Sequence, residues 1–292
     1  MRTPEYTPNT PQDFQFNPGG ALWKVSRERV ILAGGSRALL TQIAYPPVAE
    51  ALAHTGKLEA DAVGRLRGNA NSGFNLIFGT VEGNELINAG INRQHSNPDL
   101  KLTIGTTTGA HKKGTAFSPR TQEGLGLVAA TLIEGSVEGY QTFVGRLREA
   151  ERDEYTREAK TLFGGMGLRS ESLPDTYDGV REHIEVMIED EKLAVGAIAM
   201  RLAPYTMLAH TKTPAFLKEA LRLFTLDLLP DKLREQYGFK ITPGERKSAR
   251  RRASHIRAAV PHMPAVIRYN PQFRKAMRQI EAQEEANFNR AA

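Results

Sequence analysis

The apolar residues of this chain recur at intervals of three and four positions, which is the spacing of an α-helix with one buried face. The pattern is clearest from Asp61 to Phe78 and again from Glu82 to His95. In the first of these ranges the apolar positions are Val63, Leu66, Ala70, Phe74 and Ile77. We find neither alternation of the β type nor an internal repeat. The pattern therefore predicts an all-α fold.

Glycine and proline divide this pattern into separate helices. A break at Gly34-Gly35 precedes a helix over residues 36–44, and Pro46-Pro47 separates it from a short helix that ends at His54. Residues 97–118 are rich in glycine, threonine and lysine and are expected to form a loop. Further helices are predicted over residues 22–32, 123–151, 176–190, 214–228, 246–259 and 271–287, with one or two more between residues 193 and 210.

The composition is that of a globular protein and excludes several kinds of site. Hydrophobic residues make up 40% of the 292 residues, which is enough to bury a sizeable core. We expect a single helical domain over residues 21–288, preceded by an extended arm over residues 1–20. The chain contains no cysteine, which excludes disulfides, zinc–thiolate sites, iron–sulfur clusters and thiolate-ligated haem.

Neither the start of the chain nor its apolar runs indicate insertion into a membrane. Residues 1–18 are rich in proline, threonine and asparagine and lack the apolar region of a secretory signal. No apolar run reaches the length of about 20 residues that spans a bilayer. We therefore expect a cytoplasmic protein without a transmembrane segment.

The formal net charge of +6 could indicate an acidic partner. Much of the excess lies in one short stretch of predicted helix, where alanine and isoleucine separate the charges. Its cations are Lys247, Arg250, Arg251, Arg252 and Arg257. Such a pattern is more typical of a solvated helix face than of a nucleic-acid surface, so we expect no nucleic-acid partner.

Single histidines are the main candidates for metal chemistry. None of the seven histidines forms an H-x-x-x-H or H-E-x-x-H pair, so a zinc hydrolase is not supported. One imidazole is enough for haem, because the porphyrin supplies the four equatorial nitrogens. His95 ends a predicted amphipathic helix, where its ring could face apolar neighbours. An ordinary histidine at a helix end is the competing interpretation.

Three polar residues on predicted helices could face a ligand. Arg65 and Asn69 are four positions apart, so both could point at one ligand oxygen, although an exposed arginine is the simpler interpretation. Thr131 lies in the apolar helix, where a threonine usually donates to the carbonyl four residues earlier. The glycine and serine patterns match neither a nucleotide-binding loop nor a serine hydrolase. The residues alone leave the function open.

Three segments in a fixed order carry a resemblance. Residues 34–46 read G-G-S-R-A-L-L-T-Q-I-A-Y-P. A second segment extends from Gly64 to His95, and a third combines L-P-D-K-L-R-E-Q-Y-G at 229–238 with R-Y-N-P at 268–271. Together they resemble the MpaB and latex-clearing-protein (rubber oxygenase) family of haem-dependent oxygenases. In that family the first segment reads G-G-x-R-A-L-L-x-Q-I-A-H-P.

The resemblance implies a helical fold around a b-type haem and oxidation of an apolar substrate, such as an isoprenoid or a secondary metabolite, by dioxygen or peroxide. By position, His95 matches the proximal iron ligand, Arg65 the distal arginine and Thr131 the threonine of a buried A-T-L segment. Apolar residues within 74–78 and 125–133 would line the substrate side. The residues implied to contact the haem are Arg37, Gln42, Arg65 and Phe78.

The chain departs from the family's pattern on the distal side. Asn69 stands where the family motif has threonine, Ala129 where many members have histidine, and Tyr45 where the first segment has histidine. Residues 96–98 lack the usual H-x-x-V-x-G. We expect Arg65 and Asn69 to act as distal polar groups. Cleavage, hydroxylation and a peroxidase-like reaction stay open, as do a non-catalytic helical binding protein and the oligomeric state.

Overall fold

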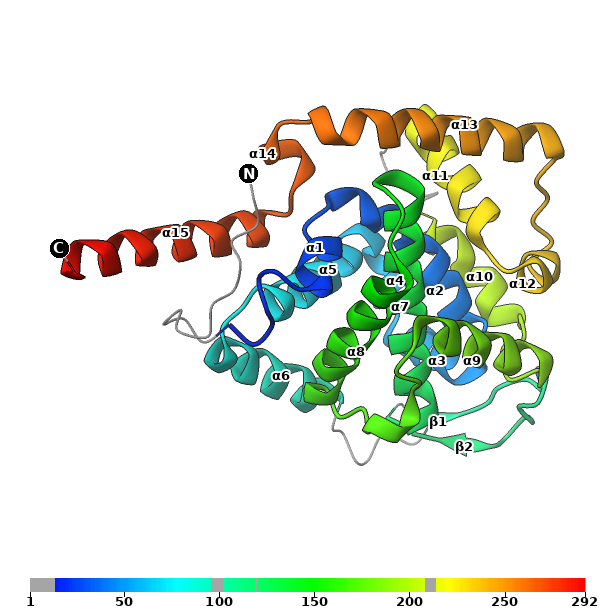
Figure 1. The fold of residues 1–292 in the computed structure, drawn as a ribbon. Helices are drawn as coiled ribbons and strands as arrows, with labels where there is room; N and C mark the ends of the chain where they lie inside the picture. Colours follow the sequence, from blue (N-terminus) through cyan, green and yellow to red (C-terminus); the bar gives the residue numbers. More distant parts are fainter. Residues whose placement is uncertain (1–13, 96–101, 119, 208–213, 292) are drawn as a thin grey trace.

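The structure, a computed structural model, describes residues 14–95, 102–118, 120–207 and 214–291. Helices make up most of these residues, which confirms the prediction of an all-α fold. Helix α7 (Gln122–Phe143) runs through the middle of the molecule, and the other helices are arranged around it (Figure 1). Its side chains are buried along most of its length, as its largely apolar sequence predicts.

Helix α7 packs most extensively against a segment formed by η1 (Arg29–Gly34) and α2 (Gly35–Ile43). Glycine makes this contact possible. A Cβ atom on Gly34 would lie 2.2 Å from the carbonyl oxygen of Gly135, which is far inside the contact distance. Because a packed backbone carbonyl has little room to move, any larger residue at position 34 would push α2 away from α7.

The N-terminal part of the chain covers one side of α7 and includes part of the predicted arm. Phe14 and Phe16 are buried, and the Phe14 ring meets Trp23 edge-on, so residues 14–20 pack against the helices. Residues 1–13 of the predicted arm lie outside the described residues. The helices of this part are α1 (Ala21–Ser26), α3 (Pro46–Thr55), α4 (Lys57–Ala60), α5 (Ala62–Ile77) and α6 (Val81–His95).

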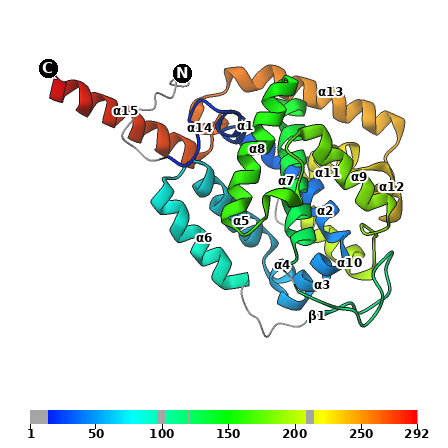
Figure 2. The ribbon, with the colours of Figure 1, turned by 60° about the horizontal axis from the view of Figure 1, so that its bottom comes forward.

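The C-terminal part surrounds the other side of α7. Helix α13 lies along one edge of the molecule, and α15 extends away from the other helices (Figures 1 and 2). The helices of this part are α8 (Glu149–Gly165), η2 (Ser170–Ser172), α9 (Tyr177–Glu189), α10 (Ala197–Thr206), α11 (Ala215–Leu228), α12 (Asp231–Gln236), α13 (Pro243–Ala259), η3 (Val260–His262), α14 (Ala265–Arg268) and α15 (Pro271–Ala291).

Two predicted helices are divided in the structure. The helix predicted over 123–151 ends at Phe143, and a new helix starts at Glu149 because the Glu151 carboxylate accepts a hydrogen bond from the amide of Arg148 at 2.8 Å. The helix predicted over 22–32 is likewise divided into α1 and η1.

The loop predicted over 97–118 contains a small β-hairpin that periodicity did not reveal. Strand β1 (Leu102–Thr103) pairs antiparallel with β2 (Ala116–Phe117), and Leu102 lies opposite Phe117. Two residues a strand are too few to show an alternating pattern. Among the described residues, no helix is both long and apolar enough to cross a membrane.

Two carboxylates of α8 cap the start of α1. Glu158 accepts a hydrogen bond from the amide of Leu22 at 2.7 Å, and Glu154 accepts one from that of Ala21 at 3.3 Å. Burial raises the pKa of Glu158 to about 7, with a further increase from Glu154, against the opposing effect of the Leu22 amide. The folded protein therefore holds the Glu158 proton more tightly than an unfolded chain does.

This raised pKa predicts a pH-dependent contribution to stability. Between about pH 5 and about pH 8 the folded state binds more protons at Glu158 than the unfolded state, so this contribution falls as the pH rises. The variant Glu158→Gln should lack this contribution. The melting temperature of the variant should therefore rise relative to that of the wild type as the pH increases across this interval. Circular dichroism melts at several pH values measure the difference. Glu149→Gln, at an exposed position of the same helix, is the control. A difference between Glu158→Gln and wild type that does not change with pH would contradict the assignment.

Candidate functional site

Two of the predicted site residues meet inside the core, where α2 crosses α7. Nε2 of Gln42 donates to Oγ1 of Thr131 at 2.9 Å, and that hydroxyl lies 2.9 Å from the carbonyl oxygen of Leu127, to which it donates. Both side chains are buried. The Thr131 hydroxyl therefore has a donor and an acceptor within the protein, and the hydrogen bond to the carbonyl four residues earlier is confirmed.

A third predicted residue, Arg37, forms a buried ion pair between the same two helices. Its Nη2 atom lies 2.7 Å from Oε1 of Glu134, and its Nε atom donates to the carbonyl of Leu228 at 2.6 Å. The side chains of the pair are 4% and 8% exposed, so both charges are shielded from water. Arg37 thus connects α2 to α7 and to the end of α11.

We call this helix contact the α2–α7 seam; its facing pairs are Gly34 with Gly135, Arg37 with Glu134, and Gln42 with Thr131. The partners follow opposite orders along the chain, as antiparallel helices require. The structure therefore brings Arg37, Gln42 and Thr131 together. Their contacts hold two helices against each other.

Phe78, the fourth residue with an implied haem contact, lies in a different part of the core. Its ring meets the ring of Trp23 edge-on, with centroids 5.0 Å apart, and that of Phe273 at 5.6 Å. Phe74 stacks on it at 6.3 Å. Phe78 therefore belongs to an aromatic cluster that joins α1, α5 and α15.

Helices α5 and α6 form a hairpin at the edge of the molecule (Figure 2). Their connection, residues 78–80, is short, so the first turn of α5 and the last turn of α6 are the parts of the two helices most distant from it. Arg65 is in that first turn, and His95 is the last residue of α6. The side chain of His95 lies outside the part of the structure that is described.

Arg65, in the first turn of α5, is half-buried. No hydrogen bond or ion pair of the described residues involves its guanidinium, and burial alone lowers its pKa below the ordinary value. A partly desolvated cation without an acceptor is unfavourable, so this position is suited to an anionic group. Asn69, one turn further along α5, is exposed.

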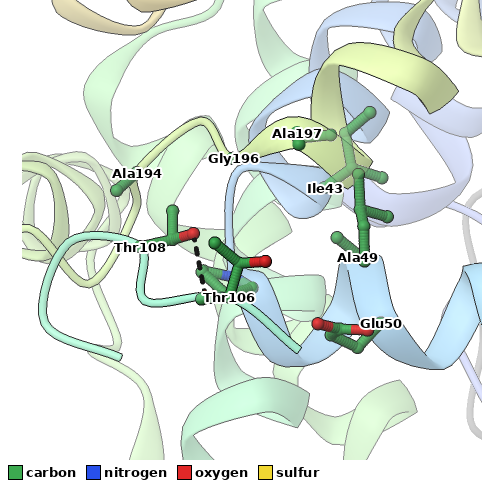
Figure 3. Close-up of a pocket in the computed structure, with 11 residues that line it drawn as sticks. Ile43, Ala49, Glu50, Thr106, Thr108, Ala194, Gly196 and Ala197 are labelled. Carbon is green, nitrogen blue, oxygen red and sulfur yellow. Dashed lines mark hydrogen bonds between the residues drawn. The ribbon is translucent and has the colours of Figure 1, made fainter. Parts of the chain in front are cut away.

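A separate pocket of about 320 Å³, which includes open solvent, lies between α3, α10 and the start of the loop (Figure 3). Small apolar side chains line it together with Thr106, Thr108 and Glu50, whose carboxylate accepts a hydrogen bond from the amide of Gly105 at 2.6 Å. None of the predicted site residues lines this pocket. Within the described residues, no three His, Asp or Glu side chains are placed to hold a metal ion.

Sequence reasoning missed a polar cluster around Tyr45. The Tyr45 hydroxyl donates to Oε1 of Glu123 at 2.8 Å, and Nζ of Lys192 lies 2.6 Å from Oε2 of the same carboxylate. The ring of His111 meets that of Tyr45 edge-on at 5.1 Å. Burial and the hydrogen bond to Glu123 raise the pKa of Tyr45 well above its ordinary value, so the phenol stays protonated. These residues are far apart in the chain, and no local pattern relates them.

Comparison with known proteins identifies one family. The sequence model described as "ER-bound oxygenase mpaB/B'/Rubber oxygenase, catalytic domain" matches residues 23–261. The match includes both helices of the seam and the α5–α6 hairpin. No curated protein and no solved structure matches the chain.

The seam predicts that Arg37 is needed for stability whether or not any cofactor is bound. The variant Arg37→Met leaves the buried Glu134 with only the more distant Arg181, 4.0 Å away, as a counter-ion, and we expect it to lose about 3 to 5 kcal/mol of unfolding free energy. Replacing both residues, as Arg37→Met with Glu134→Leu, should recover more than half of the loss. Urea denaturation measures both. The control Arg67→Met, at an exposed position, should change stability by less than about 0.5 kcal/mol. A loss below about 1 kcal/mol for Arg37→Met alone would show that the ion pair is not structural.

Proposed function

Because the chain belongs to the mpaB and rubber oxygenase catalytic-domain family, we propose that it is a haem-dependent oxygenase that oxidises an apolar small molecule with dioxygen or peroxide. The family supports an oxygenase in general. The observation that carries the finer proposal is the half-buried Arg65, which has no partner among the described residues and, like His95, lies at the end of its helix away from the connection of the hairpin.

The α5–α6 hairpin is suited to hold a haem. Its apolar side chains are incompletely covered by protein: Val63 is 37% exposed and Leu86 is 73% exposed, while Ile87 is half-buried. A porphyrin is a flat apolar plate that carries two carboxylates, so it would cover such side chains and offer Arg65 a counter-ion. His95 would provide the axial nitrogen. Val63 and Arg65, both in the first turn of α5, are the described residues that support a haem at this end of the hairpin.

The α2–α7 seam is closed and does not offer a haem the partly exposed side chains that the hairpin has. Nε2 of Gln42 and the Thr131 hydroxyl already bond to protein, and Arg37 is paired with Glu134 through Nη2, although among the described residues its Nη1 atom is buried without a hydrogen-bond partner. We propose that these residues position α7 and α2 behind the site without touching the haem. Phe78 would play the same part at the other end of α5, within its aromatic cluster.

In this proposal the hairpin residues act on the haem and its ligands, and the seam residues act only on the position of the helices. When bound, the haem supplies the oxidising chemistry, for which no side chain of this chain is a substitute. Arg65 supplies a fixed positive charge in a partly desolvated position, where it attracts an anionic oxygen more strongly than it would in water. Asn69 is exposed and could donate a hydrogen bond only to a ligand that reaches it. The apolar side chains around this end favour an apolar substrate.

A helical binding protein of the same fold is the second candidate, and two observations favour it. Position 129, where many family members have histidine, is a completely buried alanine, so α7 offers no imidazole at this point. Asn69 points to solvent, so the distal side has one polar group in place instead of two. This candidate predicts that the purified protein contains no haem and still binds apolar ligands.

The ligand role of His95 predicts a spectroscopic result. Protein expressed with adequate haem should show a Soret band, and His95→Ala should lose the band or shift it, because the axial nitrogen is removed. The control is His54→Ala, an exposed histidine on α3, which should leave the spectrum unchanged. The ligand assignment fails if His95→Ala keeps the wild-type spectrum. The proposal of a haem protein fails if the wild type shows no Soret band.

The role of Arg65 predicts a difference in affinity between two neighbouring arginines. Arg65→Gln should weaken haemin binding about tenfold or more, since a charge-assisted hydrogen bond contributes about 1.5 to 3 kcal/mol. Arg67→Gln removes the same charge from an exposed position two residues away and should bind haemin as the wild type does. Absorption titrations of the three proteins with haemin measure this. Equal affinities for all three would mean that Arg65 does not face the haem.

A further inference from the structure

The positive charge of this chain is concentrated in one segment. Residues 246–267 contain six of the 39 Lys and Arg residues and no Asp or Glu. The other 33 Lys and Arg equal the 33 Asp and Glu of the chain in number, so the whole net charge of +6 comes from this segment. The segment comprises most of α13 together with η3 and the start of α14.

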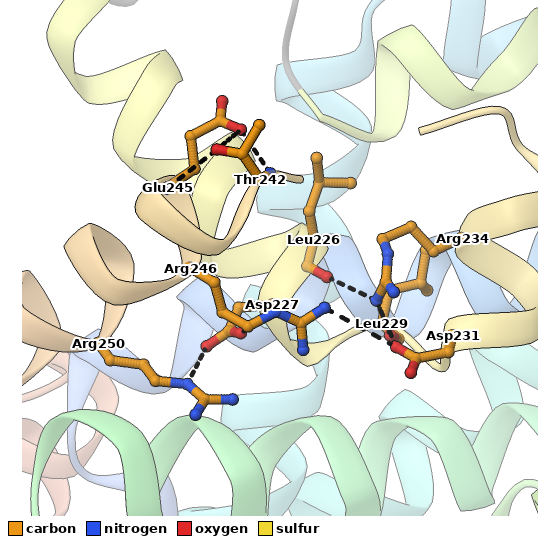
Figure 4. Close-up of polar contacts among 9 residues, drawn as sticks. All are labelled: Leu226, Asp227, Leu229, Asp231, Arg234, Thr242, Glu245, Arg246 and Arg250. Atoms are coloured by element: carbon orange, nitrogen blue, oxygen red, sulfur yellow. Dashed lines mark hydrogen bonds and ion pairs between the residues drawn. The ribbon is translucent and has the colours of Figure 1, made fainter. Parts of the chain in front are cut away.

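One face of α13 is held firmly against the protein. Ala249 and Ala253 are buried in an apolar cluster with Phe143 and Phe224. On the adjoining flank, Arg246 and Arg250 lie 3.6 Å and 3.3 Å from the carboxylate of Asp227 (Figure 4). Asp231 lies within 4.0 Å of Arg246 as well. These contacts fix which side of α13 faces outward.

The outward face presents two cations, Lys247 and Arg251, together with His255. Lys247, Arg251 and His255 follow one another at intervals of four, which places them in one row opposite Ala249 and Ala253. All three side chains are exposed, and no ion pair or hydrogen bond of the described residues involves them. The row is therefore free to meet an anionic surface.

Two exposed aliphatic side chains lie beyond the C-terminal end of α13. Val266 and Ile267, on α14, are 56% and 59% exposed. Figures 1 and 2 both show α14 close to the C-terminal end of α13. Aliphatic side chains beside a row of cations are typical of helices that lie on anionic bilayers, where the cations meet headgroups and the aliphatic groups enter the acyl boundary. Binding to nucleic-acid phosphates has no need of them.

We propose that the α13–α14 surface, formed by Lys247, Arg251, His255, Val266 and Ile267, docks this protein on a bilayer rich in anionic lipid. The cations would supply long-range attraction, and Val266 and Ile267 would fix the orientation by insertion. This inference does not depend on the haem or on the oxygenase activity, because none of its residues belongs to the α5–α6 hairpin or the seam.

Sedimentation of the full chain with vesicles tests the proposal. The protein should bind vesicles of phosphatidylcholine with about a third phosphatidylglycerol, and should bind pure phosphatidylcholine at least tenfold more weakly. Lys247→Gln with Arg251→Gln should reduce binding to the anionic vesicles about thirtyfold, because each cation near the surface contributes a few-fold. Val266→Ser with Ile267→Ser should reduce it by at least tenfold at unchanged charge.

Two control variants separate these effects from general ones. Lys112→Gln with Lys113→Gln removes the same charge from the exposed loop, and Val186→Ser with Met200→Ser removes aliphatic groups of 45% and 46% exposure. Both should bind vesicles like the wild type. Equal loss in a control, equal binding to both vesicle types, or binding to neither overturns the proposal. It is also overturned if a labelled DNA or RNA duplex binds through Lys247 and Arg251 while anionic vesicles do not.

Discussion

Helix α7 can cross η1 and α2 at this distance only because glycine occupies the positions where the backbones nearly touch. Besides Gly34 against Gly135, a Cβ atom on Gly139 would lie 3.0 Å from the carbonyl oxygen of Ile31. The remaining contacts of the seam depend on this approach. At a larger separation the ion pair of Arg37 with Glu134 would open, and each of these buried charges would lose its closest counter-ion.

The seam gives a physical reason for the sequence of residues 34–46. Gly34 permits the close approach, Arg37 pairs with α7, Gln42 bonds to Thr131, and Tyr45 bonds to the first turn of α7 through Glu123. A segment with so many specific partners is recognisable in a sequence for structural reasons alone. The chemistry that we propose lies elsewhere, on the α5–α6 hairpin, which the core supports and does not enclose.

Much of the helical fold could be predicted from periodicity, because an amphipathic helix records its buried face in its own sequence. The helix predicted from Asp61 to Phe78 is observed as Ala62–Ile77. Contacts between residues that are far apart in the chain produce no such pattern in the sequence. Arg37 and Glu134 are almost a hundred residues apart, and Tyr45 and Lys192 both meet Glu123 only in the folded chain. The spacing of Arg65 and Asn69 predicted a shared face, but not that Arg65 would be half-buried and Asn69 exposed, since that depends on which neighbours cover α5.

The central claim is that the seam is structural and that the α5–α6 hairpin receives the haem. Hydrogen exchange of the protein with and without haemin tests it most directly, because it reports each helix separately. The account predicts that haemin increases the protection of amides within residues 62–95 and leaves the amides of α2 and the middle of α7 unchanged. Haemin that binds tightly, yet protects α2 and α7 and leaves residues 62–95 unchanged, would contradict it.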